Sequence, residues 1–183
     1  MTLSREEFEA LYRTHAPEIL GYLRRRGAGD DAQDLLADTF LTGWRRRDDL
    51  PEATLRRAWL FGVARRLLLA HGRRQQPSTL IEASDVRTVP AAAGDDAEAQ
   101  EVVRAALADL PDIDRELLTM TVWERLPVVD AGAVLGLKAS AARVRLHRVR
   151  RRLALDPRLA TLLGDDPVAA SQASVDCAAP CSR

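Results

Sequence analysis

Cysteine is scarce in this chain, and its two cysteines, Cys177 and Cys181, stand within the last seven positions. Two thiols placed there cannot cross-link a core, which excludes a fold held together by disulfides. Long apolar runs are also missing. Because no stretch approaches about 18 consecutive apolar residues, a membrane-spanning helix is not expected. The first seven residues are polar and acidic, so we expect no signal peptide and a cytoplasmic location.

Aromatic residues are equally few, at 8 of 183, so a core must be built mainly from Leu, Val and Ala. Strand signals are missing as well, since no segment alternates polar and β-branched residues. Apolar residues instead recur at spacings of three and four, first between Phe8 and Leu23 and then through most of the chain. The pattern predicts an all-α fold of two small helical domains.

The formal net charge is zero, but the charges are unevenly distributed. Residues 1–76 carry a net +3, residues 77–101 a net −5, residues 102–155 a net +4 and residues 156–183 a net −2. Residues 77–101 also gather Pro, Gly, Ser and Asp, which is typical of a flexible linker. We therefore predict two mildly basic domains that meet a polyanion, an acidic linker and a C-terminal tail. The alternative is a solvated surface with no such partner.

Residues 127–153 have the layout of a helix-turn-helix. A short apolar helix is predicted to end at Gly136, and a longer helix to begin near Ser140, whose hydroxyl could cap it. Between Lys138 and Arg152 there are seven basic residues and no acidic one. The guanidinium fork of arginine can grip a phosphate or a guanine edge through two hydrogen bonds. This helix is predicted to enter the major groove of DNA, although an ordinary basic surface helix is the alternative. We also expect Gly132 to lie close to a partner helix, or else to be a tolerated neutral glycine.

Two further segments carry charge beside an apolar stripe. Residues 31–44 present the carboxylates of Asp31, Asp34 and Asp38, which form either a docking face or an ordinary solvated face. Residues 56–74 interleave arginines with Trp59 and Phe61, a pattern that suits unpaired bases and phosphates, although both aromatic residues could belong to the core.

Signs of an enzyme or a metal site are missing. We find no nucleophile, glycine-rich phosphate loop or clustered histidines, so we predict no enzyme, no catalytic residue, no metal and no cofactor. The two cysteines are either a metal- or redox-sensing pair or incidental thiols.

Four motifs occur in a fixed order: DAQDLLADTFLTGW at 31–44, RAWLFGVARR at 57–66, LPDIDRELL at 110–118, and LG at 135–136 followed by VRLHRVR at 144–150. Together they resemble bacterial sigma factors of the extracytoplasmic-function (ECF) group. The resemblance covers about two thirds of the chain. It implies a protein that binds core RNA polymerase and directs it to a subset of promoters. The alternatives are a free-standing helix-turn-helix regulator that binds duplex DNA without polymerase, and an inactive adaptor that sequesters an anti-sigma protein.

The resemblance also implies roles for individual residues. Readers of the −35 element would be Lys138, Ser140, Arg143, His147 and Arg148. Contacts with the −10 element would come from Arg56, Arg57, Arg65, Arg66 and Arg73. Docking on polymerase would use Asp34, Leu35, Asp38 and Phe40. The implied partners are core RNA polymerase, promoter DNA and an anti-sigma factor. Departures from the family pattern include Gln33, Ala37, Arg66, Pro127 and Val144.

Overall fold

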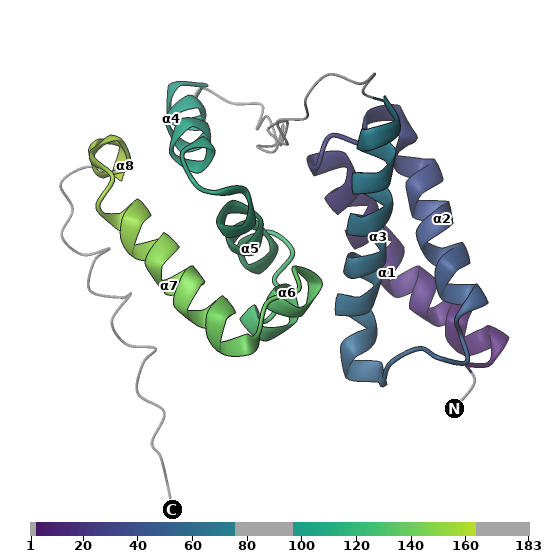
Figure 1. Ribbon diagram of the computed structural model, residues 1–183. Helices are drawn as coiled ribbons and strands as arrows, with labels where there is room; N and C mark the ends of the chain where they lie inside the picture. The colour runs from purple at the N-terminus through teal and green to yellow at the C-terminus, as the bar shows by residue number, and fades with distance from the viewer. Residues whose placement is uncertain (1–2, 76–96, 164–183) are drawn as a thin grey trace, which may run out of the picture.

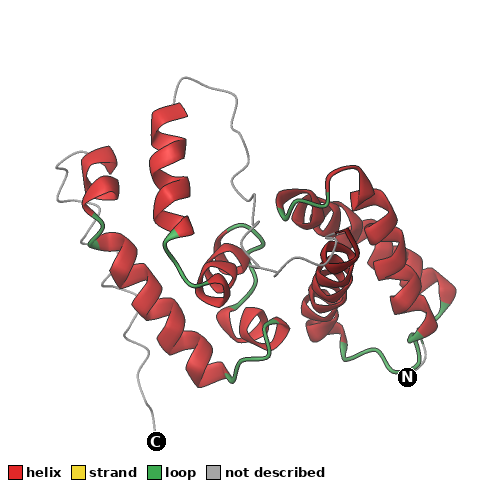
Figure 2. Cartoon of the chain, turned by 45° about the horizontal axis from the view of Figure 1, so that its top comes forward, coloured by secondary structure: helices red, strands yellow, loops and turns green. Residues whose placement is uncertain are grey.

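The computed structural model describes residues 3–75 and 97–163, and these residues are helical with short connections and no strand (Figures 1 and 2). The helices are α1 (Arg5–Arg25), the 3₁₀ turn η1 (Gly29–Asp31), α2 (Ala32–Arg45), α3 (Ala53–Gln75), α4 (Ala97–Ala108), α5 (Asp112–Val122), α6 (Val128–Val134), α7 (Ala139–Ala154) and α8 (Pro157–Leu163). The predicted all-α fold is confirmed. Most of the predicted linker and residues 164–183 of the predicted tail, with Cys177 and Cys181, lie outside the described residues. Among the described helices, none has the length and apolar character needed to cross a membrane.

The N-terminal domain consists of α1, α2 and α3 packed side by side. Helix α1 starts with a reciprocal capping box, in which the Ser4 hydroxyl accepts from the Glu7 amide and the Glu7 carboxylate accepts from the Ser4 amide. Most of its apolar stripe is buried as the spacing predicts, with Ile19 and Leu23 fully enclosed, whereas Tyr12 is exposed. An edge-to-face contact between Phe8 and Trp44, with ring centroids 5.2 Å apart, ties α1 to α2.

The C-terminal domain contains the helix-turn-helix, formed by α6 and α7. Gly136 makes the turn between the two helices with φ +73°, a conformation that glycine adopts without strain. The helices approach closely at Gly132, where a Cβ atom added to the glycine would lie 2.6 Å from the Cβ of Ala142. This confirms the close approach expected at Gly132.

Three details of this domain differ from the sequence-based prediction. Helix α4 begins at Ala97, so residues 97–101 of the predicted linker are helical, because AEAQE is made of good helix formers. Ser140 does not cap α7: Lys138 holds the N-cap position without a side-chain cap, and Ser140 lies inside the first turn. Helix α8 was not predicted. Asp156 accepts a hydrogen bond from the Arg158 amide at its start, and Pro157 takes the first helical position.

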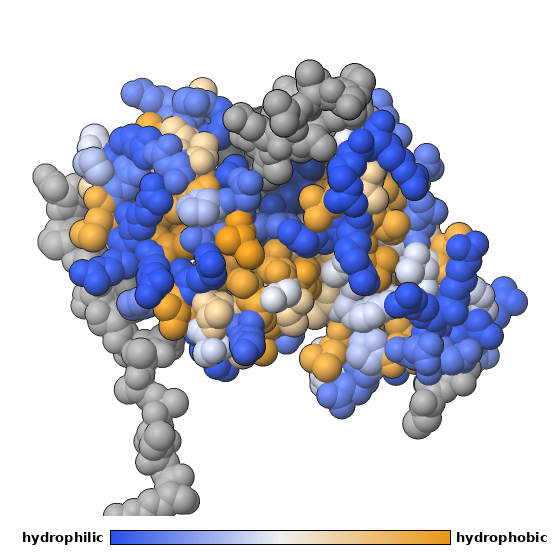
Figure 3. All heavy atoms as spheres, viewed as in Figure 1, coloured by the Kyte–Doolittle hydropathy of each residue, from blue (hydrophilic) through white to orange (hydrophobic). Residues whose placement is uncertain are grey.

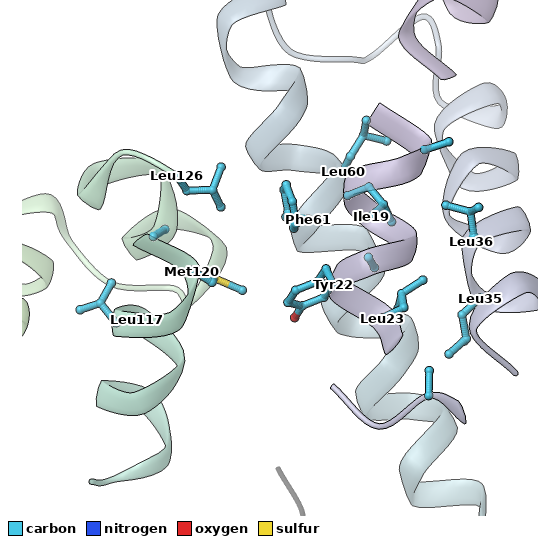
Figure 4. Packing of buried hydrophobic residues seen from close by; sticks show 14 of the residues in the cluster. Ile19, Tyr22, Leu23, Leu35, Leu36, Leu60, Phe61, Leu117, Met120 and Leu126 are labelled. Carbon is cyan, nitrogen blue, oxygen red and sulfur yellow. The ribbon is translucent and has the colours of Figure 1, made fainter. Parts of the chain in front are cut away.

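The two domains also pack against each other, which charge and composition alone did not suggest. Helix α3 contacts α6, and both domains contribute to one cluster of buried apolar residues. Figure 4 shows Met120 and Leu126 of the C-terminal domain facing Tyr22 and Phe61 of the N-terminal domain. All four side chains are buried, so the contact has an apolar centre.

Candidate nucleic-acid interface

Helix α7 separates its side chains cleanly into a buried and an exposed face. Ala142, Leu146 and Val149 are buried against the rest of the domain. The opposite face exposes Arg143 and His147, as well as Lys138, Ser140, Arg148, Arg150, Arg151 and Arg152. Hydrophilic residues accordingly cover much of the visible length of α7 (Figure 3). The five residues expected to read the −35 element therefore all lie on an accessible, positively charged surface.

Arg145 is the exception among the basic residues of α7. Its guanidinium donates to the carboxylate of Asp114 at 2.8 Å and is only half-exposed. This ion pair fastens α7 to α5 inside the domain. Of the seven basic residues between Lys138 and Arg152, one is thus already neutralised by the fold.

The arginines of α3 fall into two groups. Arg66 and Arg73 are exposed, whereas Arg56 is half-buried and donates to the carbonyl oxygen of Pro51 at 3.1 Å. Arg57 donates to the carboxylate of Glu18 in its own domain and to the carbonyl oxygen of Glu124 in the C-terminal domain. Arg65 donates to the carboxylate of Glu116, which also belongs to the C-terminal domain. The same helix therefore holds both exposed and engaged guanidinium groups.

Arg65 is held by a fork of two hydrogen bonds. Its Nε and Nη2 donate to the two carboxylate oxygens of Glu116, each at 2.9 Å. Burial alone would lower the pKa of Arg65, but the hydrogen bonds and negative charge of Glu116 outweigh it and raise the pKa. Arg65 therefore stays charged in this setting.

Glu116 and Glu124 are the residues that sequence reasoning missed. Glu124 is 4% exposed, and it accepts hydrogen bonds from Arg25 across the domain interface. Burial raises the pKa of Glu124, while the arginine partners oppose that rise. The pairing partners are 51 and 99 positions apart in the chain, and no local pattern indicates such a contact.

The residues expected to dock on polymerase separate into two kinds. Asp34 and Asp38 are exposed one turn apart on α2. Leu35 and Phe40 are buried, at 6% and 4% exposure, and contribute to the domain core. Asp31 is half-buried and pairs with His71 at 3.1 Å, which links the start of α2 to the end of α3. Of the four residues expected to dock on polymerase, Asp34 and Asp38 are the two with exposed side chains.

The aromatic residues of α3 belong to the core side of that helix. Phe61 is fully buried and packs edge-to-face on Tyr22, with ring centroids 5.4 Å apart, and Trp59 is half-buried. Base stacking on Phe61 would require α3 to leave its neighbours, whereas Trp59 is only partly covered. Within residues 3–75 and 97–163, no three His, Cys, Asp or Glu side chains are grouped so as to hold a metal ion.

Two family models match the chain, and their limits follow the two helical domains. Sigma-70 region 2 matches residues 11–77, and Sigma-70 region 4 matches residues 100–153. The ECF RNA polymerase sigma factor SigF of Caulobacter vibrioides (strain NA1000 / CB15N) is 35% identical over 139 residues, covering 74% of this chain and 77% of that protein. The RNA polymerase sigma factor CarQ of Myxococcus xanthus is 32% identical over 151 residues, covering 79% and 86%.

Two solved structures share the fold. CnrH, in complex with the cytosolic domain of CnrY, superposes with a TM-score of 0.57 at 24% identity, covering 89% of this chain and 91% of that one. The sigma factor RpoE of Bartonella quintana, in complex with the anti-sigma factor NepR, gives 0.59 at 22% identity, covering 82% and 99%.

Proposed function

The chain belongs to the ECF-type RNA polymerase sigma factors, which direct promoter-specific initiation of transcription, and on that premise we propose which of its surfaces carries each part of the task. Region 2 is the N-terminal domain and region 4 is the C-terminal domain. The family is not enzymatic, so the task consists of binding and positioning. RNA polymerase supplies the chemistry.

Helix α7 of region 4 is the element that reads the −35 duplex. Its exposed face carries Arg143, His147 and Arg148 without a neighbouring acid, and this is the observation that carries the proposal. Arginine forks can bind a guanine edge in the major groove, while the remaining basic side chains bind phosphates and set the register. Lys138 at the N-cap and Ser140 in the first turn lie at the end that a recognition helix presents to the bases.

Helix α3 of region 2 carries the contacts with the −10 element. Arg66 and Arg73 are exposed and can bind the phosphate backbone of a melted strand directly. Arg56, Arg57 and Arg65 lie on the same helix, and the last two are engaged by carboxylates in the present arrangement. Contacts of this kind offset part of the free energy needed to separate the strands.

Polymerase docking is assigned to Asp34 and Asp38 of α2. Both are exposed, and together they form an acidic strip one helical turn long. Leu35 and Phe40 support the strip from beneath, since both are buried in the core. The strip is suited to a basic surface on polymerase. Attraction between the opposite charges would position the two proteins, and an acidic surface would be repelled.

Two further assignments come from the family and its solved relatives. CnrH and RpoE were solved with the cytosolic domain of CnrY and with the anti-sigma factor NepR, and we assign an anti-sigma partner to this chain as well. We place the protein in the cytoplasm, where RNA polymerase meets promoter DNA.

Size-exclusion chromatography of the full chain with core RNA polymerase tests the docking assignment. We expect co-elution of the wild type at moderate salt, and loss of co-elution with Asp34→Arg. Asp48→Arg is the control, because it makes the same change of charge at another exposed position of region 2. Normal association of Asp34→Arg would refute the docking face. Elution of the wild type apart from polymerase, with duplex DNA still bound, would favour a free-standing regulator.

A further inference from the structure

Helix α7 exposes one large apolar side chain in the middle of its basic face. Val144 is 48% exposed, whereas Leu146 and Val149 of the same helix are buried. Between Lys138 and Arg152, every other exposed position is polar or basic. The contacts proposed above for the −35 element use the polar and basic neighbours of Val144 and leave the valine itself without a role.

Val144 points away from the core of its domain. Successive residues of an α-helix are turned by about 100° around the helix axis, at 3.6 residues per turn. The buried residues of α7 are Ala142, Leu146 and Val149, and each of them therefore lies about 140–160° around the axis from Val144. The valine stands opposite the buried face, close to the middle of the exposed one.

The fold does not need a valine at this position. Val144 belongs neither to the buried apolar cluster nor to the partly buried residues that pack against that cluster. Valine is also a weaker helix former than alanine or arginine, because its branched Cβ restricts χ1 in a helix. A single exposed valine is common on protein surfaces, so the argument for a role depends on its position.

The residues one turn away from Val144 are proposed readers of the −35 element. Ser140 and Arg148 stand four positions before and after it, and His147 stands three positions after it. Residues at these spacings are neighbours on a helix surface, and all three are exposed. Arg143 and Arg148 lie on opposite sides of the valine around the axis. With α7 in the major groove, Val144 therefore faces the edges of the bases.

The major groove offers a valine one favourable group, the C5-methyl group of thymine. The other groups there are hydrogen-bond donors and acceptors: N7 and O6 of guanine, N7 and N6 of adenine, N4 of cytosine and O4 of thymine. Valine laid over a donor or an acceptor removes water and returns no hydrogen bond, which is unfavourable. Against a methyl group, valine buries apolar surface on both molecules. The same side chain therefore favours thymine and disfavours a G·C pair.

We infer that Val144 is a specificity-determining residue of α7, which selects a thymine in the −35 element by contact with its C5-methyl group. The inference rests on the proposed function, because it requires α7 to lie in the major groove. The surrounding basic side chains supply most of the affinity through phosphates and base edges. Val144 adds discrimination at one base pair, in a surface whose charge suits DNA.

The test measures the effect of one methyl group on binding. The full chain, without polymerase, first selects duplexes from a randomised pool. Each thymine of the selected sequence is then replaced singly by deoxyuridine, which lacks only the C5-methyl group, and fluorescence anisotropy gives the Kd of each labelled duplex. The same duplexes are titrated with Val144→Ala and with Val144→Thr, which keeps one of the two methyl groups. Circular dichroism checks that the variants fold.

Val122→Ala is the matched control. Val122 is 54% exposed at the end of α5, so the substitution makes the same truncation on the same domain, outside α7. The control should bind every duplex as the wild type does. A general effect of losing an exposed valine would appear in both variants, whereas an effect on the reading of thymine should appear only at position 144.

We expect one deoxyuridine substitution to weaken binding by the wild type about three- to fivefold, as the loss of one buried methyl group requires. Val144→Ala should bind the thymine duplex more weakly by a similar factor and should distinguish the two duplexes by less than about twofold. Val144→Thr should keep most of the discrimination, because the threonine methyl group can make the same contact.

Three results would count against the inference. A selected sequence in which no thymine methyl group affects wild-type binding would overturn it. A methyl effect that persists in Val144→Ala would assign the contact to another side chain or to the shape of the DNA. Selection of no common sequence would overturn the −35 assignment together with this inference. Failure of the polymerase docking test would leave the duplex result unaffected, so the docking assignment and this inference fail separately.

Discussion

Gly132 and Ala142 lie so close that α6 and α7 meet almost backbone to backbone: a Cβ atom on the glycine would be 2.6 Å from that of the alanine. Real Cβ atoms do not approach so closely, so any side chain at position 132 forces the two helices apart. The amide of Leu137 donates to the carbonyl oxygen of Gly132 at 2.8 Å, which fixes the turn that follows. The angle between α6 and α7 therefore depends on the absence of a Cβ atom at position 132.

Gly132→Ala should destabilise region 4 by about 1–3 kcal/mol, because overpacking of a tight contact outweighs the gain in helix propensity. Gly72→Ala is the matched control, since nothing lies within 4 Å of its Cβ position and it is exposed on α3. The control should be neutral or stabilising by up to about 1 kcal/mol. Urea unfolding of both variants measures the difference. An unchanged midpoint for Gly132→Ala would show that the helices separate without cost.

Arg143→Ala plus Arg148→Ala should weaken binding to a short duplex and flatten its salt dependence. Each lost phosphate contact lowers the slope of log K against log salt by about 0.9, so two contacts would remove about 1.8. Arg145→Ala should leave the slope unchanged, because its guanidinium is already paired with Asp114. Fluorescence anisotropy at several salt concentrations gives the slopes. Polymerase association must survive in the double variant, or the −35 assignment is wrong.

Phe40→Ala and Asp38→Ala should both reduce polymerase binding, but for different reasons. Phe40 packs on Tyr12 and Phe8, with ring centroids 4.7 Å and 6.3 Å away, so its truncation should lower the free energy of unfolding by about 3–5 kcal/mol. Asp38 is exposed, and its truncation should change stability by less than about 0.5 kcal/mol. Thermal unfolding and co-elution are measured on the same samples. A stable Phe40→Ala protein that fails to bind would mean that the ring itself contacts polymerase.

His15 should make the stability of region 2 depend on pH. Burial lowers the pKa of His15 below its usual value near 6.5, although Glu18 opposes that effect. The unfolded chain therefore takes up a proton more readily than the folded one, and stability is full above pH 6.5 and falls as the pH drops through that value. Unfolding in urea at several pH values between 5.5 and 7.5 should show a smaller decline for His15→Gln than for the wild type. His147→Gln, at an exposed position, should behave as the wild type.

Helices with a clear periodic stripe could be predicted from the sequence. The stripe from Phe8 to Leu23 and the glycine turn at Gly136 are local features, and both are found where the spacing places them. Helix α8 also has a local signal, since Asp156 followed by Pro157 is a typical start of a helix, but its seven residues are too few to show a periodic stripe. The exposed positions of the arginines on α7 could also be predicted, because the buried side chains of a helix recur with its period.

The domain interface could not be predicted in the same way. Arg65 and Glu116 stand on different domains, and their pairing depends on tertiary packing rather than on any repeat in the chain. Glu124 would be expected at the surface, as most glutamates are, yet it is nearly fully buried because arginine neutralises it there. Leu35 and Phe40 could not be assigned from the sequence for the same reason. They belong to a motif that resembles a docking helix, but a motif does not show which of its side chains contact the partner and which are buried beneath them.

Lys138, the exposed residue at the start of α7, is also the only lysine in the chain. Every other basic side chain is a guanidinium or an imidazole, and both react poorly with amine-directed reagents. A single fluorophore attached to a side-chain amine would therefore stand at the proposed edge of the major groove, without an engineered cysteine. In the unlabelled protein, the reactivity of the Lys138 amine toward acylating reagents would fall when the promoter is bound.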